Sequence, residues 1–99
     1  MVKHIIIWTL KEGLSESEKT KALIKAKRGL EGLKGRVDGL EAISVQIDNL
    51  ESSNADMLLD STLTDEAALA AYQKHPDHLE VAKFIKEITC DRKCIDFLI

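Results

Sequence analysis

The amino-acid sequence predicts a single α+β domain in which strands and helices follow the order β-α-β-β-α-β. Some stretches repeat apolar residues every three or four positions, as amphipathic helices do, and others alternate or are rich in β-branched residues, as strands are. A capping box that begins at Ser15 and a proline at position 76 mark two helix starts. The 99 residues suffice for one hydrophobic core, so we expect residues 1–99 to form one domain.

The first strand is expected from Val2 to Leu10, because β-branched residues dominate this stretch. Both of its faces are largely apolar. One face would carry Val2, His4, Ile6, Trp8 and Leu10, and the other Lys3, Ile5, Ile7 and Thr9. A strand with this pattern is covered on both sides.

The first helix is predicted to begin after Ser15, whose spacing to Glu18 is that of a capping box. Its apolar residues recur at steps of three and four and form one stripe: Leu23, Ala26, Leu30, Leu33 and Val37. We expect the helix to stop near Lys34, with Gly35 as the left-handed residue that terminates it.

The next two strands are predicted to form an antiparallel hairpin. Apolar and polar residues alternate from Leu40 to Asp48, and a second run extends from Asp56 to Thr64. The polar segment Glu51 to Asn54 between them is typical of a turn.

Two short helices are expected on either side of a His-Pro break. Thr64 or Asp65 caps the first, which ends near Lys74, and Pro76 begins the second, which reaches about Ile88. His75 is then expected near the N-cap. His78 lies four residues before Ala82 and seven before Ile85, on the inward stripe. The last strand is expected from Cys94 to Ile99.

This order of elements is that of a ferredoxin-like fold, a four-stranded antiparallel sheet with helices on one face. The other face would then be open to solvent, which the apolar first strand cannot tolerate. A large apolar face usually marks an interface, and packing two such sheets together closes a barrel in a twofold dimer. We therefore expect a homodimer that associates through the sheet face.

Composition and charge exclude several classes of function. A formal net charge of −3 argues against nucleic-acid partners, and no apolar run approaches the ~20 residues that span a membrane. The N-terminus lacks a secretory signal, so a cytoplasmic location is expected. Cys90 and Cys94 are too far apart along a strand for a disulfide and lack zinc-site spacing. No cofactor motif is present, and we expect neither cofactor nor metal.

Three stretches of the sequence carry a resemblance to a known family. They are Val2 to Ile5, Asp56 to Leu63 and, above all, the Tyr-x-x-His-Pro-x-His pattern of Tyr72 to His78. On these residues the chain resembles the stress-responsive α/β-barrel (Dabb) family over nearly its whole length. The resemblance implies a small dimeric barrel, but most members of the family have no assigned reaction.

The resemblance also implies candidate catalytic residues. The family member of known chemistry, olivetolic acid cyclase, closes an aromatic ring by intramolecular aldol condensation without a cofactor. By analogy His78 would be a general base, Tyr72 would orient or polarise a carbonyl, and His4 would assist. Leu23 and Ala26 stand where that cyclase has aromatic pocket residues, which implies a different pocket shape. Histidine suits the removal of a proton next to a carbonyl near neutral pH.

Three functions remain open from the sequence. The chain could be a homodimer that binds a small molecule in a cleft near His78, with an unassigned reaction. It could be a cofactor-independent enzyme of the cyclase or lyase type that uses His78, Tyr72 and His4. It could also be a non-enzymatic stress-protection or assembly protein, in which a Tyr72–His78 hydrogen bond merely stabilises the helix break.

Overall fold

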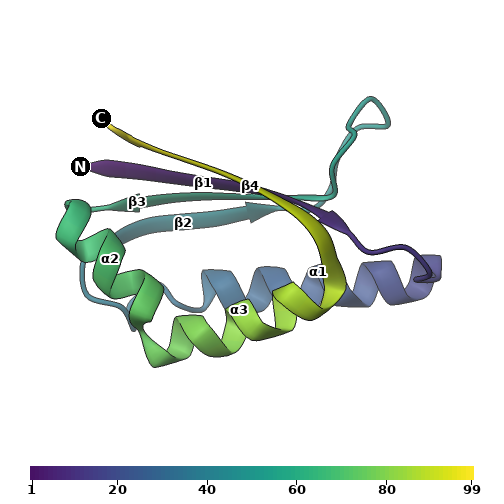
Figure 1. The fold of residues 1–99 in the computed structure, drawn as a ribbon, viewed down its shortest axis with the longest axis horizontal. Coiled ribbons are helices and arrows are strands. Elements are labelled where there is room, and N and C mark those ends of the chain that lie inside the picture. The colour runs from purple at the N-terminus through teal and green to yellow at the C-terminus, as the bar shows by residue number, and fades with distance from the viewer.

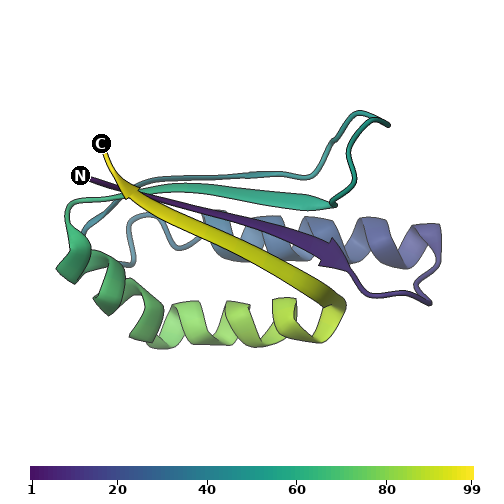
Figure 2. The same cartoon turned by 45° about the horizontal axis from the view of Figure 1, so that its top comes forward.

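A computed structural model describes all residues of the chain, from 1 to 99. It contains four strands and three helices in the order β1 (Val2–Leu10), α1 (Glu16–Glu31), β2 (Leu40–Gln46), β3 (Met57–Leu63), α2 (Glu66–Lys74), α3 (Pro76–Ile88) and β4 (Thr89–Leu98). The strands form one antiparallel sheet in the order β2-β3-β1-β4. The helices all lie on one side of this sheet (Figures 1 and 2). The predicted ferredoxin-like α+β fold is confirmed.

The helix starts follow the predicted caps. Ser15 and Glu18 form both hydrogen bonds of the capping box, and Asp65 rather than Thr64 caps α2. His75 ends α2 and is the N-cap of α3, where its Nδ1 accepts a hydrogen bond from the Asp77 amide at 3.1 Å. The break at His75 is therefore a helix boundary that the proline and this cap together define.

The end of the first helix was predicted too late. α1 ends at Glu31 rather than near Lys34, although Gly35 adopts the expected positive φ of 87°. The chain continues in tight turns, in which Leu33 donates to the Leu30 carbonyl. Turns of this kind keep a period of about three residues, so Leu33 is buried like a helical residue although it lies beyond the helix.

The strand boundaries also differ from the prediction. β4 begins at Thr89, not at Cys94, because its first half is polar yet pairs its backbone with β1. β2 ends at Gln46 instead of Asp48. A sheet ladder is formed by backbone groups, so side-chain alternation underestimates the length of a polar edge strand.

The core lies between the sheet and the helices, and the opposite sheet face is uncovered. Strand β1 contributes its even-numbered residues to the core, so His4 lies on the helix side of the sheet and is 1% exposed. The large apolar residues of the uncovered face are Ile5, Ile7, Leu58, Ile95 and Phe97. No helix of the chain is long and apolar enough to cross a membrane.

Candidate functional site

Three aromatic rings from three different elements form a row beneath the sheet. The rings belong to His4 on β1, Tyr72 on α2 and His78 on α3. The centroids of Tyr72 and His78 are 4.4 Å apart with the planes tilted by 48°, and those of His4 and Tyr72 are 6.1 Å apart in an edge-on arrangement. The structure therefore brings together the three residues that the sequence selected.

Two polar atoms in this row have no hydrogen-bond partner. Tyr72 is completely buried, yet its hydroxyl is unbonded, and so is the buried Nδ1 of His78. Burial raises the pKa of Tyr72 to about 12, so its hydroxyl keeps its proton. An unsatisfied buried hydroxyl costs about 1–3 kcal/mol. The hydrogen bond between Tyr72 and His78 that a purely structural role would use is absent.

His4 is held by a residue that the sequence did not single out. Its Nδ1 donates a hydrogen bond to Oδ1 of Asp96, its direct cross-strand partner on β4. Its backbone carbonyl accepts a hydrogen bond of 2.9 Å from the hydroxyl of Ser61. A carboxylate on one ring nitrogen selects the imidazole tautomer and its orientation. Only the strand register, which spacing along the chain does not reveal, identifies Asp96.

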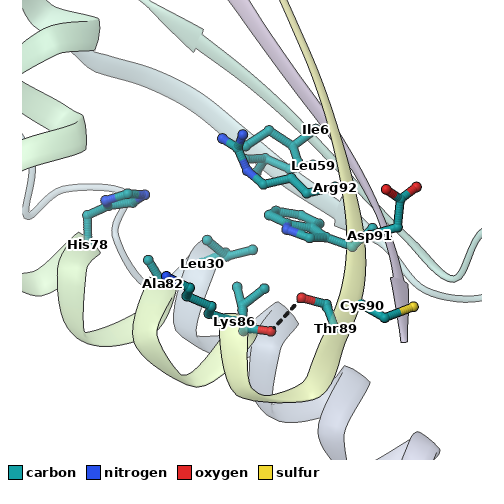
Figure 3. Close-up of a pocket in the computed structure, with 12 residues that line it drawn as sticks. Ile6, Leu30, Leu59, His78, Ala82, Lys86, Thr89, Cys90, Asp91 and Arg92 are labelled. Atoms are coloured by element: carbon teal, nitrogen blue, oxygen red, sulfur yellow. Dashed lines mark hydrogen bonds between the residues drawn. The ribbon is translucent and has the colours of Figure 1, made fainter. Parts of the chain in front are cut away.

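A cavity of about 590 Å³ lies between the sheet and α3, and His78 is part of its wall. Figure 3 shows His78 on one side of this space and Arg92, from β4, on the other. The remaining lining residues are mostly apolar and form the floor: Ile6, Trp8, Leu30, Leu59, Ala82 and Ile85, with Lys86, Thr89, Cys90 and Asp91 at the rim. Neither Leu23 nor Ala26 lines the cavity, so the residue of α1 that shapes it is Leu30.

Positive charge collects at the rim of this cavity. Lys86 and Arg92 line it without an ion pair, whereas the carboxylate of Asp91 lies 3.5 Å from the ammonium of Lys93. Burial lowers the pKa of His78, and the positive charge of Arg92 lowers it further, while the backbone carbonyl of Gln73 acts in the opposite direction. The imidazole is therefore kept neutral around pH 7 and can accept a proton.

The His4 end of the row also carries atoms that could ligate a metal. His4 Nδ1, Cys94 Sγ and a carboxylate oxygen of Asp96 all lie within 4.8 Å of one another. Spacing along the chain does not identify this group, because His4 lies 90 residues before Cys94 and 92 before Asp96. Pairing β1 with β4 in a predicted register is the signal that finds it.

The arrangement suits proton transfer at a carbon atom next to a carbonyl. A neutral imidazole can take the proton, and a protonated phenol can donate a hydrogen bond to the oxygen that becomes negative. The cavity is also lined by the hydroxyl of Thr89 and the thiol of Cys90, but these donate to the backbone carbonyls of Ile85 and Leu10. General base chemistry with an oxyanion donor is therefore the reaction type that these side chains can support.

Comparisons with known proteins place the fold in context. The family model described as "Stress responsive A/B Barrel Domain" matches residues 2–99. No curated protein matches the chain. A dimeric ferredoxin-like protein of unknown function from Bacteroides fragilis superposes with a TM-score of 0.93, at 23% identity over 99% of this chain and 95% of that one.

Two further solved structures share the fold. A Dabb family protein from Mesorhizobium loti has a TM-score of 0.74 and 20% identity, with 99% of this chain and 95% of that chain covered. A hydroxynitrile lyase from Passiflora edulis has a TM-score of 0.74 and 16% identity, with coverage of 99% and 92%. Identities this low establish the common fold and leave the chemistry to be argued from the residues.

Proposed function

Because this chain belongs to the stress-responsive A/B barrel domain family, we propose that it forms a homodimer that binds a small carbonyl compound beside His78. In this proposal the protein is a cofactor-independent enzyme of the cyclase or lyase type. The observation that carries it is a pair of unbonded buried atoms, Nδ1 of His78, which is part of the cavity wall, and the hydroxyl of Tyr72, which packs against His78 without lining the cavity itself. Leaving two buried polar atoms without hydrogen bonds lowers the stability of the folded protein. A ligand that bonds to both atoms offsets this loss.

His78 is the proposed general base. It removes a proton from the carbon next to a carbonyl, and the electron pair of the broken C–H bond moves to the carbonyl oxygen. The Tyr72 hydroxyl donates a hydrogen bond to this oxygen, which supplies the partner that the hydroxyl lacks in the free protein. His4 assists as a positioning residue, because its ring and that of Tyr72 pack in a T-shaped pair and Asp96 fixes its orientation.

The cavity favours a substrate with an apolar body and an anionic group. Trp8 and its aliphatic neighbours offer an apolar floor, and the unpaired cations of Lys86 and Arg92 stand at the rim. A carboxylate is the group that an arginine binds with two parallel hydrogen bonds. A hydroxynitrile lyase on the same fold gives precedent for lyase chemistry, although it shares only 16% identity with this chain.

The proposed dimer interface is the uncovered face of the sheet. Ile7, Ile95 and Phe97 on this face are 38%, 61% and 45% exposed in the single chain. The solved ferredoxin-like protein from Bacteroides fragilis is described as dimeric. The loop between β2 and β3 extends to the same side, away from the helices, where it would contact a second sheet (Figure 1).

Hydrogen–deuterium exchange tests the proposed chemistry without knowledge of the natural substrate. Methyl ketones such as 4-acetylbenzoate are incubated with the protein in D₂O, and loss of the α-proton signal is followed by NMR. We expect exchange above the buffer rate, reduced on the order of 100-fold in His78→Asn. His75→Asn is the matched control, because asparagine preserves the N-cap. Equal exchange in the wild type and His78→Asn contradicts the proposal.

A further inference from the structure

We propose that His4, Cys94 and Asp96 form a binding site for a divalent cation that accepts nitrogen and sulfur ligands, with Zn²⁺ as the best match. The three donors come from the two ends of the chain, on β1 and β4. They offer an imidazole nitrogen, a thiol sulfur and a carboxylate oxygen, the ligand types that zinc takes in proteins. This inference does not depend on the function proposed above.

The strand register creates the cluster. His4 is the direct partner of Asp96, and Cys94 pairs with Ile6, one step further along the same face of the sheet. Side chains at alternate positions of paired strands point in one direction. The donors are therefore held by a rigid backbone ladder between two neighbouring strands.

Two of the three distances between the donor atoms suit tetrahedral coordination. Typical zinc–ligand distances of about 2.0–2.3 Å place the ligand atoms of a tetrahedral site about 3.3–3.8 Å from one another. Cys94 Sγ lies 3.8 Å from His4 Nδ1 and 3.6 Å from Asp96 Oδ1. His4 Nδ1 and Asp96 Oδ1 are in hydrogen-bond contact and would move apart by rotation of the Asp96 side chain as the ion enters.

The surroundings of the cluster also suit an ion. His4 is nearly inaccessible and packed against Tyr72, which fixes its ring, while the Asp96 side chain is 36% exposed and leaves a path from solvent. The side chains of His4, Cys94 and Asp96 hydrogen-bond with one another, and Arg92 is the cation that lies beside Cys94. Three protein ligands leave a fourth position for water, as in zinc sites that are open to solvent.

Cys90 provides a matched control for the test. It is a second free cysteine on β4, but its thiol donates to the Leu10 carbonyl at the other end of the strand and belongs to no donor cluster. Untagged protein is stripped with a chelator and titrated with Zn²⁺ by calorimetry and with Co²⁺ by absorption spectroscopy. Circular dichroism establishes that each variant is folded.

We expect one Zn²⁺ per chain and a thiolate-to-cobalt charge-transfer band in the wild type and in Cys90→Ser. Cys94→Ser is expected to lose the band, and Cys94→Ser and Asp96→Asn are each expected to weaken Zn²⁺ binding by at least about 10-fold. The proposal is overturned if the wild type binds no stoichiometric Zn²⁺ or its Co²⁺ complex lacks the band. It is also overturned if Cys94→Ser binds as the wild type does, or if Cys90→Ser loses binding equally. The wild-type spectrum decides the question even if a variant fails to fold.

Discussion

The ring centroids of Tyr72 and His78 lie 4.4 Å apart, yet the Tyr72 hydroxyl and His78 Nδ1 form no hydrogen bond with each other. In a buried pair selected only for stability, such atoms would be paired. The proposed function assigns these atoms to a ligand and not to a clamp on the helix break. This relationship has consequences for stability that can be measured separately from any reaction.

Replacing Tyr72 with phenylalanine is expected to leave the protein at least as stable as the wild type. The change removes a buried hydroxyl that has no partner, and unsatisfied hydroxyls cost about 1–3 kcal/mol. Ligand binding beside His78 should weaken at the same time. Urea denaturation measures the free energy of unfolding, and a loss of more than about 1 kcal/mol in Tyr72→Phe would contradict this account.

Ser61 supplies the comparison for that experiment. Its hydroxyl is also completely buried, but it donates to the His4 carbonyl at 2.9 Å. Ser61→Ala should therefore lower the free energy of unfolding by about 1 kcal/mol. The two substitutions remove the same kind of atom and differ in whether that atom is bonded.

Stability is expected to fall as the pH decreases below about 6.5, the usual pKa of histidine, because of His78. Burial lowers the pKa of His78 in the folded protein, so the unfolded chain binds more protons between that lowered pKa and 6.5. The free energy of unfolding therefore decreases as the pH falls through this window. Above pH 6.5 the contribution of His78 is fully present. His78→Asn should flatten the dependence, as measured by urea denaturation between pH 7.5 and pH 5.

Nuclear magnetic resonance measures directly whether the pKa of His78 is lowered in the folded protein. The His78 ring protons should titrate with a midpoint below the usual histidine value of 6.5. A midpoint above that value would mean that a nearby negative charge outweighs burial, and it would remove His78 as a base that is neutral at pH 7.

The fold could be predicted because local signals in the sequence agree with it. The capping box at Ser15 and the proline at position 76 identify helix starts, and the apolar faces of β1 show which layers must be covered. The predicted end of α1 was wrong because tight turns continue the apolar period past Glu31. The start of β4 was wrong because polar residues pair through their backbones.

The candidate site was predictable only in part. The family motif selects Tyr72 and His78, and the structure adds that neither polar atom is bonded. Asp96 and Cys94 could not be found from spacing, because their relation to His4 depends on the register of two strands from opposite ends of the chain. Arg92 lies on the same strand, and its place at the cavity depends on that register too.

The cavity is expected to prefer anionic over neutral ligands of the same shape. Trp8 is the only tryptophan and lines the cavity, so its fluorescence reports binding there. We compare 4-acetylbenzoate with the neutral 4-acetylbenzamide and expect Arg92→Gln to weaken only the anion, by about fivefold, as for a partly exposed ion pair of about 1 kcal/mol. Lys83→Gln, on the exposed side of α3, should change neither affinity.

The two ligands separate two kinds of failure. If neither quenches Trp8 fluorescence, the cavity does not bind small carbonyl compounds of this kind. If both bind equally well in the wild type, the cavity binds such compounds and the preference for anions is wrong.

The uncovered sheet face is expected to hold two chains together. Ile95 is the cross-strand partner of Ile5 on this face and is 61% exposed in the single chain. Ile95→Glu would place a charge within the proposed interface, and burying an unpaired charge costs several kcal/mol. Analytical ultracentrifugation at micromolar concentration should show a dimer for the wild type and a monomer for this variant.

Leu79→Glu is the control for that change. Leu79 is also an exposed apolar residue, at 52%, but it lies on α3, on the other side of the sheet from the uncovered face. A dimer interface on the sheet face leaves this variant dimeric, whereas an interface formed by the helices would make it a monomer. A monomeric wild type, or a dimer that survives Ile95→Glu, would show that the sheet face is not where the chains associate.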